Sequence, residues 1–62
     1  MRDIENRLEE VTNLCNYRLW HMADVKINQI YEEFINDTVK MNENQEEWMF
    51  CLIDRISIAL YC

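Results

Sequence analysis

Apolar residues return every three or four positions over most of the chain, the spacing that gathers side chains on one face of an α-helix. Successive stripes predict three helices, over residues 3–22, 24–41 and 45–61. The first stripe consists of Ile4, Leu8, Val11, Cys15, Leu19 and Met22. The second consists of Ile27, Ile30, Tyr31, Phe34, Thr38 and Met41.

The third predicted helix is apolar around most of its circumference. Its main face consists of Trp48, Met49, Leu52, Ile53, Ile56, Ala59 and Leu60. A second apolar set consists of Phe50, Cys51, Ile58, Tyr61 and Cys62. A helix of this kind requires burial on more than one side, so we expect it to be central. Phe50, Ile58 and Tyr61 are candidates for contact with a second copy of the chain.

The boundaries between these helices rest on register and on capping residues. Lys26 would interrupt the first stripe if the helix continued, so we place a break at Ala23–Asp24 with Asp24 as the cap. One continuous helix over residues 3–41 is the alternative. Asp3 is the expected cap of the first helix. Asn44 followed by Glu47 has the spacing of a capping box for the third helix, after a turn at residues 42–44.

The chain contains neither glycine nor proline, the residues that tight hairpins and phosphate-binding loops usually need. Their absence favours long helices joined by short polar turns. We therefore predict an all-α fold, a small bundle of two or three helices forming a single domain over residues 1–62. A chain of this length is near the lower limit for a self-sufficient core, which makes a dimer an open alternative.

Three cysteines, an odd number without a CxxC pair, indicate free thiols in a reducing compartment. A Cys51–Cys62 disulfide would need the third helix to be broken, because eleven helical residues span roughly 16 Å. Charged residues interrupt the N-terminus, and the apolar C-terminal stretch is shorter than the about 20 residues that span a bilayer. We expect a soluble protein of the cytoplasm, the host cytoplasm if it is viral.

Twelve acidic and six basic residues give a net charge of −6, concentrated after residue 26. This sign argues against direct nucleic-acid binding, which depends on phosphate contacts. The acids near the second turn could instead imitate phosphate charge and engage a basic groove on a protein. Ordinary solubility charge is the alternative. These acids are Glu32, Glu33, Asp37, Glu43, Glu46 and Glu47.

Candidate catalytic and metal-binding chemistry is sparse. His21 is the only histidine, and Cys15 lies six positions earlier on a different helical face. Structural zinc requires four ligands and catalytic zinc three, at recognisable spacings. A nucleophile requires a base within reach and a group that orients it. The sequence therefore predicts no enzyme, no metal and no cofactor.

Four residues of the first predicted helix lie off its stripe and have the composition of interface anchors, aromatic side chains beside an arginine. They are Tyr17, Arg18, Trp20 and His21. Trp20 could equally fold back over the core near the predicted break.

In length, acidity and helical character the chain resembles small phage-encoded proteins that disable host machinery, such as anti-CRISPR proteins and polymerase inhibitors. This resemblance covers size and charge alone. The hypothesis is a non-enzymatic binding module, a stoichiometric inhibitor or adaptor of a larger nucleic-acid-handling protein complex. The alternative is a self-assembling structural or scaffold oligomer of helices. A helix-turn-helix DNA reader is a third hypothesis, which the charge disfavours.

Overall fold

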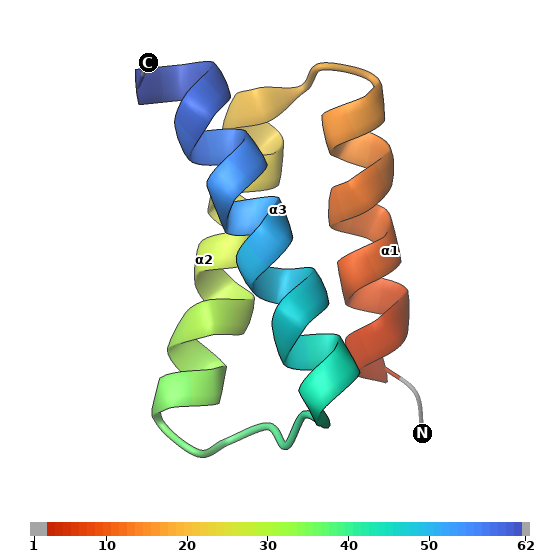
Figure 1. Ribbon diagram of the computed structural model, residues 1–62, viewed down its shortest axis with the longest axis vertical. Helices are drawn as coiled ribbons and strands as arrows, with labels where there is room; N and C mark the ends of the chain where they lie inside the picture. Colours follow the sequence, from red (N-terminus) through yellow and green to blue (C-terminus); the bar gives the residue numbers. More distant parts are fainter. Residues whose placement is uncertain (1–2, 62) are drawn as a thin grey trace.

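The computed structural model describes residues 3–61, which form three helices that run alternately up and down (Figure 1). The helices are α1 (Asp3–Asn16), α2 (Trp20–Ile35) and α3 (Glu43–Tyr61). Each helix packs against both of the others. The predicted all-α bundle is therefore confirmed. None of the helices of residues 3–61 is both long enough and apolar enough to cross a bilayer.

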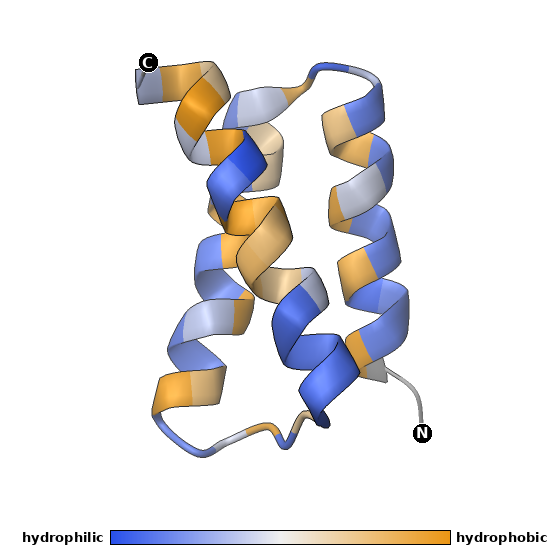
Figure 2. Ribbon diagram, viewed as in Figure 1, coloured by the Kyte–Doolittle hydropathy of each residue, from blue (hydrophilic) through white to orange (hydrophobic). Residues whose placement is uncertain are grey.

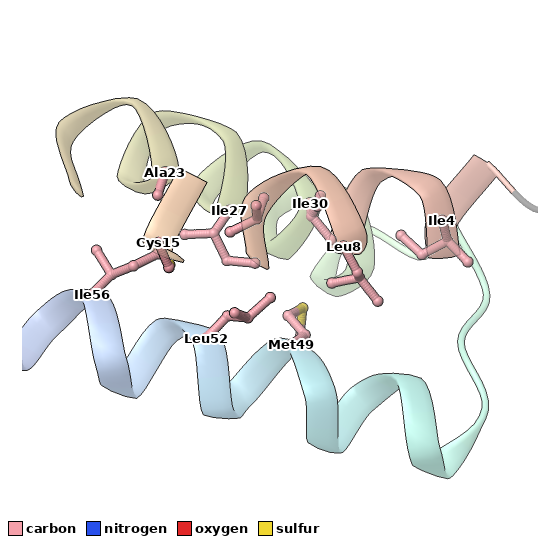
Figure 3. Packing of buried hydrophobic residues seen from close by; sticks show 10 residues of the cluster. Ile4, Leu8, Cys15, Ala23, Ile27, Ile30, Met49, Leu52 and Ile56 are labelled. Atoms are coloured by element: carbon pink, nitrogen blue, oxygen red, sulfur yellow. The ribbon is translucent and has the colours of Figure 1, made fainter. Parts of the chain in front are cut away.

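The core forms along the axis of the bundle from one narrow stripe on each helix. Figure 3 shows side chains from all three helices pointing toward one another. The buried set is Ile4, Leu8, Val11, Cys15, Ala23, Ile27, Ile30, Met49, Leu52 and Ile56. The first predicted stripe is thus buried as far as Cys15, whereas its last two members, Leu19 and Met22, are exposed.

The break between α1 and α2 lies at residues 17–19, so the prediction of a break at Ala23–Asp24 was wrong. Ala23 is buried within α2, and Asp24 caps nothing. The alternative of one helix over residues 3–41 was also wrong. Lys26 does not interrupt the core, because it lies at its edge and pairs with Glu10 of α1, Nζ to Oε2 3.4 Å.

A left-handed residue ends α1. Arg18 has φ 62°, and the N–H groups of Arg18 and Leu19 donate to the carbonyls of Cys15 and Leu14 at 3.0 and 2.9 Å. These two bonds form a Schellman motif, which usually carries glycine at the left-handed position. The helix therefore ends without glycine, which is why sequence reasoning placed the break too late.

The same motif ends α2 at Ile35, six residues before the predicted boundary at Met41. Asp37 has φ 64°, and the N–H groups of Asp37 and Thr38 donate to the carbonyls of Phe34 and Glu33 at 3.1 and 2.8 Å. Met41 follows in the loop and packs against the core from there.

A capping box begins α3, two residues earlier than predicted. The backbone N–H of Gln45 donates to Asn42 Oδ1 at 2.8 Å, and that of Asn42 donates to Gln45 Oε1 at 3.0 Å. The expected pair, Asn44 and Glu47, lies inside the helix instead. The motif and its spacing were right and the register was wrong. α1 begins at Asp3, whose side chain lies outside the described part, so its capping role stays a prediction.

Polar contacts tie α1 to the other two helices. Arg7 donates two hydrogen bonds to the carboxylate of Glu33 in α2, from Nη1 to Oε1 at 2.7 Å and from Nη2 to Oε2 at 3.0 Å. Trp48 Nε1 of α3 donates to Thr12 Oγ1 at 3.0 Å, and that hydroxyl donates to the carbonyl of Leu8 at 2.9 Å. These contacts fix the register of α1 beside a core that is otherwise apolar.

Candidate protein-binding surface

The two ends of the bundle differ in character. We define the turn end as residues 10–27 and 52–61, around the α1–α2 turn and the last turns of α3 (Figure 1). The loop end is residues 3–9 and 28–51, around the α2–α3 loop. Figure 2 shows this contrast along α3, whose first turns are hydrophilic and whose later turns are mostly hydrophobic.

Charge follows the same division. The turn end contains three acidic and three basic residues, whereas the loop end contains nine acidic residues against Arg7 and Lys40. Apolar exposure is the reverse. Of the large hydrophobic side chains that are exposed, six are at the turn end: Tyr17, Leu19, Met22, Val25, Ile58 and Tyr61. The other three, Tyr31, Ile35 and Phe50, are at the loop end.

The four predicted anchor residues gather at the α1–α2 turn, in two different situations. Tyr17 is 77% exposed, and Arg18 and His21 are also exposed. Trp20 is partly buried and packs against the core, as the alternative interpretation for this residue described. Tyr17, Arg18 and His21 are therefore exposed to solvent, whereas Trp20 contributes to the packing of the core.

Met22 and Val25 extend this exposed surface along α2, and sequence reasoning missed both. They are 53% and 58% exposed. Met22 has the spacing of the first stripe and was therefore expected to be buried. Val25 belongs to neither of the first two stripes, and this was the one signal that could have found it. A shallow hollow of about 320 Å³, lined by His21, Met22, Val25 and Lys26, lies here. We call it the α2 hollow.

The six predicted acids all belong to the loop end. Glu32, Asp37, Glu43 and Glu47 are exposed, and Glu46 is half-buried. Glu33 differs, because its carboxylate is bound by Arg7, whose hydrogen bonds lower the pKa of Glu33 below its ordinary value. Glu43 and Glu46 lie in the first turn of α3, where the helix dipole favours negative charge. Part of the acidic set therefore has a structural role.

The predicted self-association residues lie along α3. Phe50 makes edge-to-face contacts with Tyr31 and Phe34 of α2, with ring centroids 6.3 Å apart in both pairs. It is nevertheless still half exposed. Ile58 and Tyr61 are more exposed, and Asp54 and Arg55 interrupt the apolar surface between them and Phe50.

The cysteines occupy unlike environments. Cys15 is buried in the core, and this burial raises the pKa of its thiol, an effect that the charge of Arg55 partly offsets. Cys51 is exposed on α3. Cys62 lies outside the described residues. Within residues 3–61, the His, Cys, Asp and Glu side chains form no group of three that could hold a metal ion.

Comparison of the chain with known protein families, with curated proteins and with solved structures finds no match.

Proposed function

We propose that this protein is a non-enzymatic binding module that occupies a surface of a larger protein in a stoichiometric complex. The observation that carries the proposal is the exposed apolar set at the turn end, led by Tyr17. These residues do not belong to the buried core or to the partly buried side chains that pack against it. Exposed aromatic and methionine side chains beside an arginine are enriched where proteins meet.

The more specific proposal is an inhibitor or adaptor of a nucleic-acid-handling complex. It is supported by the exposed carboxylates of the loop end, Glu32, Asp37, Glu43 and Glu47. Clustered carboxylates on a rigid frame steer association with a basic groove, and such association weakens as salt rises.

The first experiment is capture of the partner from the native host with tagged protein, identified by mass spectrometry. The association rate is then measured at several salt concentrations. Reversal of Glu32 and Glu47 to lysine should slow association and flatten its salt dependence. The matched control is Asp54→Lys at the turn end, compared with Glu47→Lys alone, because both residues are exposed acids of α3 and both reversals change the net charge equally. If the two single reversals change the rate equally, the carboxylates of the loop end have no specific role.

A second candidate function is self-assembly, supported by the exposure of Phe50, Ile58 and Tyr61 on α3. Two copies that packed these residues together would bury them in a symmetric interface. Light scattering over a concentration series tests this directly. A constant monomer mass removes the candidate, whereas a dimer that Ile58→Ser and Tyr61→Ser dissociate supports it.

A further inference from the structure

The outer face of α3 has an apolar strip that the bundle leaves uncovered. Phe50, Ile58 and Tyr61 are exposed, and none of them belongs to the core or to the side chains packed against it. At about 100° per residue they share one side of the helix, roughly 80° wide, with the exposed residues Glu47 and Asp54. We call these five residues the outer strip. Its members follow one another at intervals of three and four positions, the spacing by which one helix packs along another, so the expected occupant is a helix.

The outer strip is symmetric about its centre. Asp54 lies in the middle, with Phe50 and Ile58 four positions to either side. Glu47 and Tyr61 lie seven positions to either side. When two copies pack antiparallel about a two-fold axis at Asp54, each half of the strip therefore meets the other half. Phe50 of one copy meets Ile58 of the second, and the hydroxyl of Tyr61 can donate to the carboxylate of Glu47.

The charged centre of the strip is self-complementary as well. Asp54 and Arg55 are both exposed, and neither forms an ion pair within residues 3–61. In the antiparallel pair, Arg55 of each copy lies about 1.5 Å along the axis from Asp54 of the other, so charges of opposite sign alternate around the axis. A parallel pair would instead set Asp54 against Asp54 and Glu47 against Glu47. A single polar position in an apolar seam fixes the register of paired helices, at some cost in stability.

The distribution of charge over the molecule favours the same orientation. The loop end carries nine acidic residues against two basic ones, whereas acids and bases balance at the turn end. An antiparallel pair places the two loop ends at opposite ends of the dimer, with the two Glu47 residues roughly 21 Å apart along the axis. Charges at physiological salt are screened over about 8 Å, so repulsion between the two loop ends is weak.

We infer that two copies of this chain pack antiparallel through the outer strip of α3, with Asp54 and Arg55 of each copy paired across the two-fold axis. This inference rests on the second candidate function, self-assembly, and specifies its interface. It gives one role to the exposed apolar residues of α3 and to the charged pair that interrupts them.

The first test is charge exchange at the centre of the strip, with the dissociation constant of the dimer measured by sedimentation equilibrium. Asp54→Arg places only positive charges around the axis and should raise that constant about tenfold or more. Adding Arg55→Asp exchanges the two charges and should restore association to within about threefold of wild type. The control is Glu9→Arg, which makes the same change of charge at an exposed acid of α1 and should not weaken association.

The second test measures the orientation of the two copies by pulsed electron paramagnetic resonance. A spin label is attached at Glu43→Cys in a protein that also carries Cys51→Ser and Cys62→Ser, while the buried Cys15 is kept. Glu43 lies eleven positions before Asp54, so the labelled positions of an antiparallel dimer should be roughly 33 Å apart along the axis. A parallel dimer would place them side by side, at about the 8–10 Å that separates the axes of packed helices.

The outcomes separate this inference from the other proposals. A constant monomer mass would overturn the inference and the second candidate function together, and would leave the proposed binding to a larger protein standing. Labels that lie side by side, or a dimer that Asp54→Arg does not weaken, would keep self-assembly and overturn the antiparallel interface. If the chain is a monomer and Ile58→Ser abolishes capture of the native partner, the outer strip binds that partner and the inference is wrong.

Discussion

The two turns of this bundle end their helices with the same backbone geometry and surround it with different side chains. At the loop end, Asp37 takes the left-handed position, and the following capping box satisfies the start of α3. Gln45 also donates to Glu5 of α1 at 3.0 Å. At the turn end, Arg18 takes that position, no side chain caps α2, and Tyr17 and Leu19 are exposed.

The difference separates side chains that hold the fold together from side chains that the fold leaves exposed. Polar partners at the loop end meet within the chain, so that end contributes to stability. The turn end has a strained backbone at Arg18 and exposed apolar side chains, and neither contributes to the buried core. The following changes break or sharpen this comparison, from the largest expected effect to the smallest.

The largest effect should come from the core that joins both ends. Leu8→Ala removes a fully buried side chain and should lower the free energy of unfolding by about 2–5 kcal/mol. The control is the same change at Leu19, which is half exposed at the turn end and should cost about 1 kcal/mol. Urea unfolding followed by circular dichroism measures both. Equal losses would mean that the turn end belongs to the core.

The capping box should come next. Asn42→Ala removes the acceptor for the Gln45 N–H and should destabilise the protein by about 1 kcal/mol. Asn44→Ala changes the same residue type inside the helix and should be neutral or slightly stabilising, since alanine favours helix. Thermal unfolding of the two variants decides between the observed cap and the one expected from spacing. A larger loss for Asn44→Ala would contradict the observed register.

Relief of strain at the left-handed residues should have a smaller, stabilising effect. Arg18→Gly should raise the free energy of unfolding by about 0.5–1 kcal/mol, because glycine removes the clash but makes the unfolded chain more flexible. Asp37→Gly should gain less, since aspartate tolerates this conformation better. A loss of stability in Arg18→Gly would show that its side chain supports the fold.

The ion pair between α1 and α2 should give a small, pH-dependent effect. Arg7 lowers the pKa of Glu33 in the folded protein, so the pair stabilises the fold above the ordinary carboxyl pKa of 4.5. That contribution is lost as the pH falls through the lowered value. Wild type should therefore melt slightly above Glu33→Gln at pH 7, and the gap should close on acidification. A gap that persists at pH 2 would contradict this linkage.

The three helices and most of the core can be predicted from the spacing of apolar residues. The positions where the helices begin and end cannot. Ile4, Leu8, Val11 and Cys15 are buried as their stripe predicts. The stripe continues in sequence to Leu19 and Met22, but the helix has ended, and only backbone geometry at Arg18 reveals it. Sequence offers no sign that arginine will accept a positive φ where glycine is expected.

Part of the candidate surface could also be predicted from the spacing of apolar residues. Tyr17, Arg18 and His21 lie off the first predicted stripe, so their exposure could be anticipated. Met22 was assigned to the end of the first predicted helix, whereas it lies in α2. Glu33 was counted with the free acids, because its pairing with Arg7 joins residues 26 positions apart. Contacts of that range depend on how α1 and α2 pack.

The most direct test of the account measures stability and partner binding in one variant of the turn end, Tyr17→Ala with Val25→Ser. Both side chains are more than half exposed. We predict a melting temperature within a few degrees of wild type, and at least a tenfold loss in capture of the native partner. A variant that unfolds at clearly lower temperature yet captures the partner as wild type does would contradict the assignment of this end to binding.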